Sequence, residues 1–162
     1  MTGKKLVFAI ISLAAFISPA VEEVYVDGGA MSIFVQGGSK MRHRVGGVAK
    51  LGVYFSPDIA AEFGVGELEG QTSLAAKALW HLHGWEEFNL LFGYERFDPF
   101  LAIGARGFLG DGAGDVGPLC GLGALYYLSD SWALRFDADA SVGLDNTPSG
   151  IYSVALSLRY SF

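Results

Sequence analysis

Few side chains of this sequence are placed to do chemistry. Its three histidines are His43, His81 and His83. His81 and His83 would share a face on a strand and could bind a metal, but spacing supplies no third ligand, so interior histidines hydrogen-bonded to neighbours are favoured. His43 and Ser39 could pair as base and nucleophile, but no acid lies nearby in sequence to orient the imidazole. The sequence thus predicts no catalytic residues, metal or cofactor.

The remaining reactive motifs are also better explained without chemistry. Cys120 is the single cysteine, so it can form no internal disulfide, and we interpret it as a small apolar residue. The segment Gly110–Asp115 lacks the third acid and final glutamate of a calcium loop and the Gly-Lys-Ser/Thr ending of a phosphate loop, which favours a flexible acidic loop. With 11 basic and 17 acidic residues, the chain is not expected to bind nucleic acid.

Charged residues instead recur at every second position of apolar segments. In the segment 132–144, apolar side chains alternate with Arg135, Asp137 and Asp139, a period of two that predicts a strand. The same rule predicts eight strands: 24–34, 45–55, 59–66, 74–83, 100–108, 118–128, 132–144 and 152–162. The facing of the first strand stays open. The segment 84–98 is too long for a tight turn, and we favour a short helix at Trp85 to Arg96, the alternative being a fourth strand at 88–94.

The first twenty residues have the zones of a secretory signal peptide. Lys4 and Lys5 precede an apolar run, and small residues precede Val21. We expect cleavage after Ala20, a single domain over residues 21–162, and a net charge that falls from −6 to −8 with the two lysines. Hydrophobic residues make up 51%, yet no later run reaches helix-spanning length. The alternating segments then suit a closed barrel in lipid.

The C-terminal segment Leu158-Arg159-Tyr160-Ser161-Phe162 resembles the last strand of bacterial outer-membrane barrels. The whole mature chain resembles the small OmpA-type and OmpX-type family. That resemblance implies an all-β, eight-stranded antiparallel up-and-down transmembrane β-barrel in the bacterial outer membrane. It also implies that Tyr160 and Phe162 form a signal read by the outer-membrane assembly machinery. We expect a monomer.

The resemblance says less about function than about fold, because function belongs to sites. We expect a non-enzymatic protein contributing to envelope integrity or surface interaction, with an adhesin-like binding module as the nearest alternative. A lipid A-modifying enzyme with a rim site around His43 is an alternative from another class. A pore is disfavoured, because eight strands enclose little more than their own side chains.

Two sets of charged residues are the candidate sites. The interior set is expected to pair within the barrel, with Asp137 opposite Arg159 and Lys50 one register step from Glu62; its members are Asp27, Lys50, Glu62, Lys77, Arg106, Arg135, Asp137, Asp139 and Arg159. Lys40, Arg42 and Arg44 lie in a predicted external loop, 37–44, where they either contact lipopolysaccharide phosphates or form an ordinary solvated charge run. Further loops are predicted at 67–73, 109–117 and 145–150, with short turns at 56–58 and 129–131.

Overall fold

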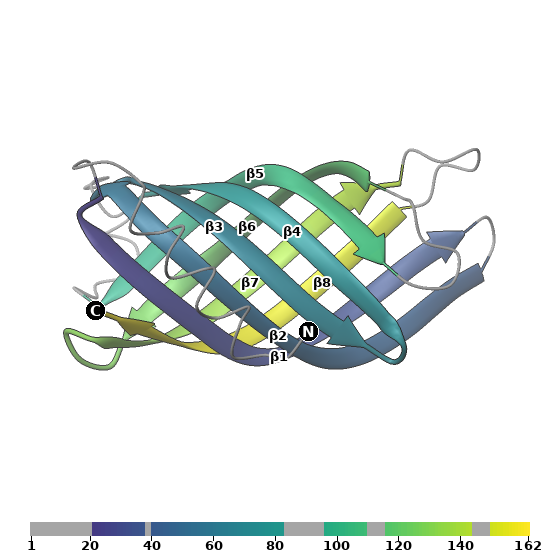
Figure 1. Cartoon of the computed structure of the whole chain (residues 1–162), viewed down its shortest axis with the longest axis horizontal. Coiled ribbons are helices and arrows are strands. Elements are labelled where there is room, and N and C mark those ends of the chain that lie inside the picture. Colours follow the sequence, from purple (N-terminus) through teal and green to yellow (C-terminus); the bar gives the residue numbers. More distant parts are fainter. Residues whose placement is uncertain (1–20, 38–39, 83–95, 110–115, 144–149) are drawn as a thin grey trace.

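The computed structural model describes residues 21–37, 40–82, 96–109, 116–143 and 150–162. Within these ranges the chain forms eight strands: β1 Glu23–Gly37, β2 Lys40–Ser56, β3 Ile59–Leu68, β4 Gln71–His81, β5 Phe97–Leu109, β6 Val116–Tyr127, β7 Trp132–Val142 and β8 Gly150–Ser161. Each strand pairs antiparallel with the next and β1 pairs with β8, so the sheet closes into a barrel (Figure 1). The predicted eight-stranded antiparallel β-barrel is confirmed. The predicted signal peptide, 1–20, lies outside the described residues.

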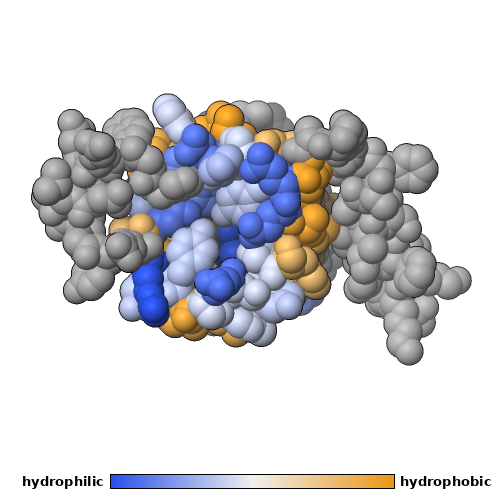
Figure 2. Space-filling model, turned by 90° about the vertical axis from the view of Figure 1, so that its left-hand side faces the viewer, coloured by the Kyte–Doolittle hydropathy of each residue, from blue (hydrophilic) through white to orange (hydrophobic). Residues whose placement is uncertain are grey.

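The alternation of the sequence decides which side chains enter the barrel. On β7, Arg135 is 0% exposed, whereas its neighbours Leu134 and Phe136 are 42% and 48% exposed. Successive side chains of a strand point to opposite faces, so one set fills the interior and the other covers the outside. Viewed from one end, hydrophilic residues occupy the centre and hydrophobic residues lie around the margin (Figure 2).

The structure decides the fourth strand in favour of the first interpretation. β4 spans Gln71–His81, so the segment 74–83 was correctly assigned apart from its last two residues. Leu82 was expected to face outward but is only 7% exposed, because the strand ends at His81 and alternation no longer fixes its direction. The helix expected at Trp85 to Arg96 and the alternative strand 88–94 fall on residues 83–95, outside the described ranges.

Two predicted loops are wrong, both at the end where β1 meets β2, called here the loop end. The segment 37–44 belongs largely to β2, which begins at Lys40 and pairs with β1 from its first residue. The segment 67–73 is a two-residue turn, Glu69-Gly70, whose φ angles of 35° and 84° give the twist of a tight hairpin. Charged and glycine residues suggested loops, but cross-strand backbone hydrogen bonds extend both hairpins. The loops expected at 109–117 and 145–150 contain residues 110–115 and 144–149, which are not described.

The interior is layered along the barrel axis. At the opposite end, called the turn end because the turns at 57–58 and 128–131 lie there, Tyr25, Tyr54, Leu79, Phe100 and Leu125 form a buried cluster. At the loop end, a second cluster joins aliphatic side chains of four strands and includes Met31, Ile33, Val48, Leu68 and Ile151. The charged side chains lie between these two apolar layers.

Candidate functional site

Seven of the eight strands contribute to the predicted interior charges, which the barrel brings together. β1 contributes Asp27, β2 to β5 contribute one charge each, β7 contributes three and β8 contributes Arg159. All are at most 8% exposed: Asp27, Lys50, Glu62, Lys77, Arg106, Arg135, Asp137, Asp139 and Arg159. A buried charge must be paired and hydrogen-bonded to be tolerated.

Arg135 is the centre of this network. Its Nη1 donates to Asp27 Oδ2 at 2.6 Å, and its Nη2 donates to Asp137 Oδ1 at 2.6 Å and to Glu62 Oε1 at 3.2 Å. The guanidinium carbon also lies 4.8 Å from the centroid of the Phe100 ring. A planar group with five donors can serve three carboxylates at once, which a lysine in this place could not do.

Arg159 links the charges to the aromatic layer at the turn end. Its Nε donates to Asp27 Oδ1 at 3.0 Å and its Nη1 donates to the Tyr54 hydroxyl at 2.8 Å. Its guanidinium lies 3.5 Å from the centroid of the Tyr25 ring, whose hydroxyl donates to Glu62 at 3.1 Å. The contact between cation and aromatic face is strengthened by burial.

The remaining charges lie toward the loop end. Lys50 forms an ion pair with Asp137. Lys77 Nζ lies 2.8 and 3.0 Å from the two Asp139 oxygens, and Arg106 Nη2 donates to Asp139 at 2.9 Å. These pairs join β2, β4 and β5 to β7 across the barrel.

One predicted pairing is wrong. Asp137 lies opposite Ala155 rather than Arg159, because Val142 pairs with Gly150 and the β7–β8 hairpin is centred near residue 146 instead of 148. Arg159 instead lies opposite Asp27 across the β1–β8 seam. The other prediction placed Lys50 one register step from Glu62. Glu62 lies opposite Gly52, which is two residues from Lys50, so Glu62 and Lys50 are diagonal neighbours on the same face.

A second polar group lies at the turn end; it confirms His81 as an interior, hydrogen-bonded residue, but its partners Asp98 and Tyr127 were not predicted. His81 Nδ1 and Asp98 Oδ2 lie 2.7 Å apart, and the Tyr127 hydroxyl donates to the same Asp98 oxygen at 3.3 Å. Asp98 had been left outside the strands, so its inward direction was not recognised; Pro99 and Phe100, which follow it, were the available strand signal. His83 lies outside the described residues, and those ranges contain no cluster of three or more metal-binding side chains.

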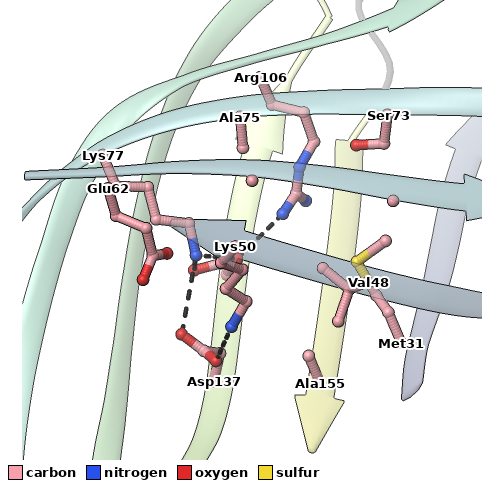
Figure 3. A pocket seen from close by; sticks show the side chains of 13 residues that line it. Met31, Val48, Lys50, Glu62, Ser73, Ala75, Lys77, Arg106, Asp137 and Ala155 are labelled. Atoms are coloured by element: carbon pink, nitrogen blue, oxygen red, sulfur yellow. Dashed lines mark hydrogen bonds and ion pairs between the residues drawn. The ribbon is translucent and has the colours of Figure 1, made fainter. Parts of the chain in front are cut away.

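The interior leaves little free volume near the charges. Between the ion pairs and the aliphatic layer lies a cavity of about 20 Å³, lined by Lys50, Lys77, Arg106 and neighbouring small residues (Figure 3). That is room for about one water molecule. The network therefore acts as a plug of paired charges and offers no substrate-sized cavity there.

The basic cluster lies on β2 rather than in a loop. Lys40 and Arg42 are exposed and Arg44 is half-buried, and all three occupy the same face of the strand. The first β2–β3 pair is Gly46 with Leu68, so this part of β2 extends past β3. His43, on the opposite face, stacks on Phe34 with ring centroids 4.6 Å apart. Ser39 is outside the described residues.

The C-terminal aromatic residues lie at the turn end of β8. Phe162 is 74% exposed and its N–H donates to Val24 O at 3.0 Å. Tyr160 packs between Trp132 and Phe162, with ring centroids 4.9 Å apart in each case. The last residue is thus held at the seam while its ring faces outward.

Comparison with known proteins is informative at the level of structure. No family model and no curated protein matches the sequence. Among solved structures, Neisserial surface protein A is 12% identical with a TM-score of 0.63, covering 86% of this chain and 97% of its own. The outer membrane protein OprG from Pseudomonas aeruginosa is 9% identical with a TM-score of 0.61, covering 88% and 97%.

The Yersinia pestis attachment invasion locus protein Ail is 15% identical with a TM-score of 0.60, covering 86% of this chain and 98% of its own. A de novo designed transmembrane β-barrel is 16% identical with a TM-score of 0.57, covering 90% and 98%. Each match extends over nearly the whole of the known chain. The chain has the fold of the small eight-stranded outer-membrane β-barrels, the OmpA-type and OmpX-type architecture.

Proposed function

We propose that the chain is an integral, non-enzymatic protein of the bacterial outer membrane, exported by residues 1–20 and folded as a monomer. The observation that carries this proposal is the outer surface of the barrel. Large apolar side chains are exposed along it, among them Leu101, Ile103, Leu122, Phe136 and Leu156, at 45 to 68%. The outward positions of β4 to β8 hold no Asp, Glu, Lys or Arg among the described residues. Such a surface suits hydrocarbon and would aggregate in water.

Aromatic side chains at the turn end support the same proposal. Trp80, Tyr126 and Trp132 are 53%, 42% and 43% exposed and face outward at the turn end, where Trp132 lies beside Tyr160. Rings of this kind gather where the membrane meets water, because they combine an apolar body with a polar tip. The turn end then faces the periplasm and the loop end faces outward.

The interior supports a role without catalysis. The carboxylates of the interior network accept hydrogen bonds from arginine, lysine or tyrosine, and the cavity beside them, of about 20 Å³, is too small for a substrate. The proposed contribution is therefore structural, toward envelope integrity, with surface contacts made at the loop end. A change in lipid A acylation on deletion of the gene would instead favour the lipid-modifying enzyme.

Cys120 provides a direct test of membrane placement. It is exposed, lies opposite Ile103 and Ala140 on the outward face, and is the single cysteine of the chain. In lipid nanodiscs, where both ends of the barrel face water, a charged maleimide should label it very slowly until the protein is unfolded. The matched control is Cys120→Ala with Asp130→Cys, a turn position that should be labelled at once. Equal rates for both proteins would contradict the proposal.

We further infer that the extended β1–β2 hairpin contacts lipopolysaccharide phosphates. Lys40, Arg42 and Arg44 recur every second residue, about 7 Å apart, and their cross-strand partners Gly37, Val35 and Ile33 carry no charge. Cations at the outer rim of an acidic protein, without a charged cross-strand partner on β1, suit charge-assisted contacts with anionic sugars and lipids.

Charge reversal tests this contact. Replacing Lys40, Arg42 and Arg44 together by Glu should weaken lipopolysaccharide binding and reduce its dependence on salt concentration. The matched control conserves charge, with Lys40→Arg, Arg42→Lys and Arg44→Lys, and should retain binding. If the reversed protein binds as well as the wild type, the cluster is an ordinary solvated charge run.

A further inference from the structure

The interior charges divide into two groups with different balances. Toward the turn end, Arg135 and Arg159 are paired with Asp27 and Glu62, two cations with two anions. Glu62 also accepts a hydrogen bond from the Tyr25 hydroxyl. This half of the network is therefore electrically balanced and well hydrogen-bonded.

Toward the loop end the balance is different. Lys50, Lys77 and Arg106 share two carboxylates, those of Asp137 and Asp139. Arg135 also forms an ion pair with Asp137. The nine-residue network as a whole holds five cations and four acids, so within this set one positive charge has no matching acid in a low-dielectric interior. Such a charge is costly unless something neutralises it.

We assign the excess positive charge to Arg106. Arg106 is 4% exposed, and its Nη2 donates to Asp139. No described group accepts a hydrogen bond from its Nε or Nη1. Lys77 and Ser153 also donate to Asp139. Buried guanidinium donors without an acceptor are rare and indicate a missing ligand.

The space beside these donors fits a small ligand. The cavity of about 20 Å³ is lined by the cations Lys50, Lys77 and Arg106, by Ser73, and by the paired carboxylates of Glu62, Asp137 and Asp139. Gly64 lines it without a side chain, and a Cβ there would come no closer than 3.5 Å to its neighbours, whereas the space beside Gly66 is taken by the Met31 methyl group. In Figure 3 the Arg106 guanidinium points down toward the ion pairs at the cavity.

We propose that this cavity is a binding site for one monatomic anion of halide size, chloride under ordinary conditions, held by Arg106 and the neighbouring lysines. The ion restores the charge balance of the loop-end group and accepts from the free guanidinium donors. Larger oxyanions are excluded by volume. A water molecule would fill the space but would not neutralise the charge.

Anion-dependent stability tests the site in the whole mature protein. Thermal unfolding in a zwitterionic detergent is followed by circular dichroism in sodium chloride and in sodium gluconate of equal ionic strength. The wild type should unfold several degrees higher in chloride, with saturation, because an ion bound to the folded state alone stabilises it. Arg106→Met should remove the difference, whereas the exposed control Arg42→Met should keep it.

Crystals grown with bromide provide a second measurement that needs no variant. An anomalous peak within hydrogen-bond distance of the Arg106 guanidinium is expected. Equal midpoints in chloride and gluconate, a chloride effect that persists in Arg106→Met, or bromide crystals with only water at this place would each overturn the proposal. If Arg106→Met fails to fold, the bromide measurement decides.

Discussion

Removal of the Asp137 carboxylate is the most informative perturbation of the barrel interior. It accepts from Arg135 Nη2 at 2.6 Å and Nε at 3.1 Å, forms an ion pair with Lys50, and lies 3.7 Å from Lys77. In Asp137→Ala, Arg135 keeps two other acids, but Lys50 loses the one acid in ion-pair contact with it among the described residues. A buried charge left without its partner costs roughly 3 to 5 kcal/mol.

A double-mutant cycle separates this orphaned charge from the lost packing. Lys50→Met removes the charge while keeping most of the apolar stem. Asp137→Ala with Lys50→Met should therefore lose less than the sum of the single losses, by roughly 1 to 3 kcal/mol. The free energy of unfolding is measured by urea titration of the detergent-folded barrel, followed by tryptophan fluorescence.

The same experiment distinguishes the observed pairing from the one expected from the hairpin. Asp137→Ala combined with Arg159→Met should show weaker coupling, because Arg159 contacts Asp27 instead. Stronger coupling of Asp137 to Arg159 than to Lys50 would refute the described network. A loss below about 1 kcal/mol for Asp137→Ala would show that these charges are solvated rather than buried.

Three further outcomes are expected. A Cβ on Gly104 would lie 2.0 Å from a backbone oxygen of β4, so Gly104→Ala should lower the free energy of unfolding, measured by urea titration, by about 1 to 3 kcal/mol. A Cβ on Gly28 would meet nothing within 4 Å, so Gly28→Ala should lower it much less. Arg159→Lys keeps the charge but cannot hold both Asp27 and the Tyr54 hydroxyl, so the urea midpoint should fall. Deleting Phe162 should lower the yield of assembled barrel in cells, measured by gel mobility without heating, while protein refolded in detergent keeps near-normal stability.

The alternation of residues was sufficient to predict the strands and the interior charges where polar and apolar positions are separated. Arg135, Asp137 and Asp139 stand between apolar neighbours, so their direction follows from the period of two. The same reasoning left β1 open because its interior positions include Tyr25, Met31 and Ile33, which are as apolar as the outward ones. The charged network occupies a middle layer between two largely apolar clusters, and a one-dimensional pattern does not reveal layers.

Contacts between distant strands could not be predicted for a different reason. They depend on register, and a shift of the β7–β8 hairpin centre by two residues moved Arg159 away from Asp137. Asp98 was missed because it lies at the edge of a segment with helical spacing. Its partner His81 is on the preceding strand, and the partner of Arg159 is 132 residues away, so local spacing carried no information about either contact.

The seam between the first and last strands has a consequence for the order of folding. Asp27 and Arg159 lie directly opposite each other there, 132 residues apart in the chain, with Nε and Oδ1 separated by 3.0 Å. Before β8 pairs with β1, the edge of β1 exposes the Asp27 carboxylate and a row of unpaired backbone groups. Both are unfavourable in lipid, which offers them no hydrogen bonds. Closure neutralises the acid and pairs the backbone in a single event. In the membrane placement proposed above, the open sheet would not be stable in lipid by itself, and insertion and closure would be concerted.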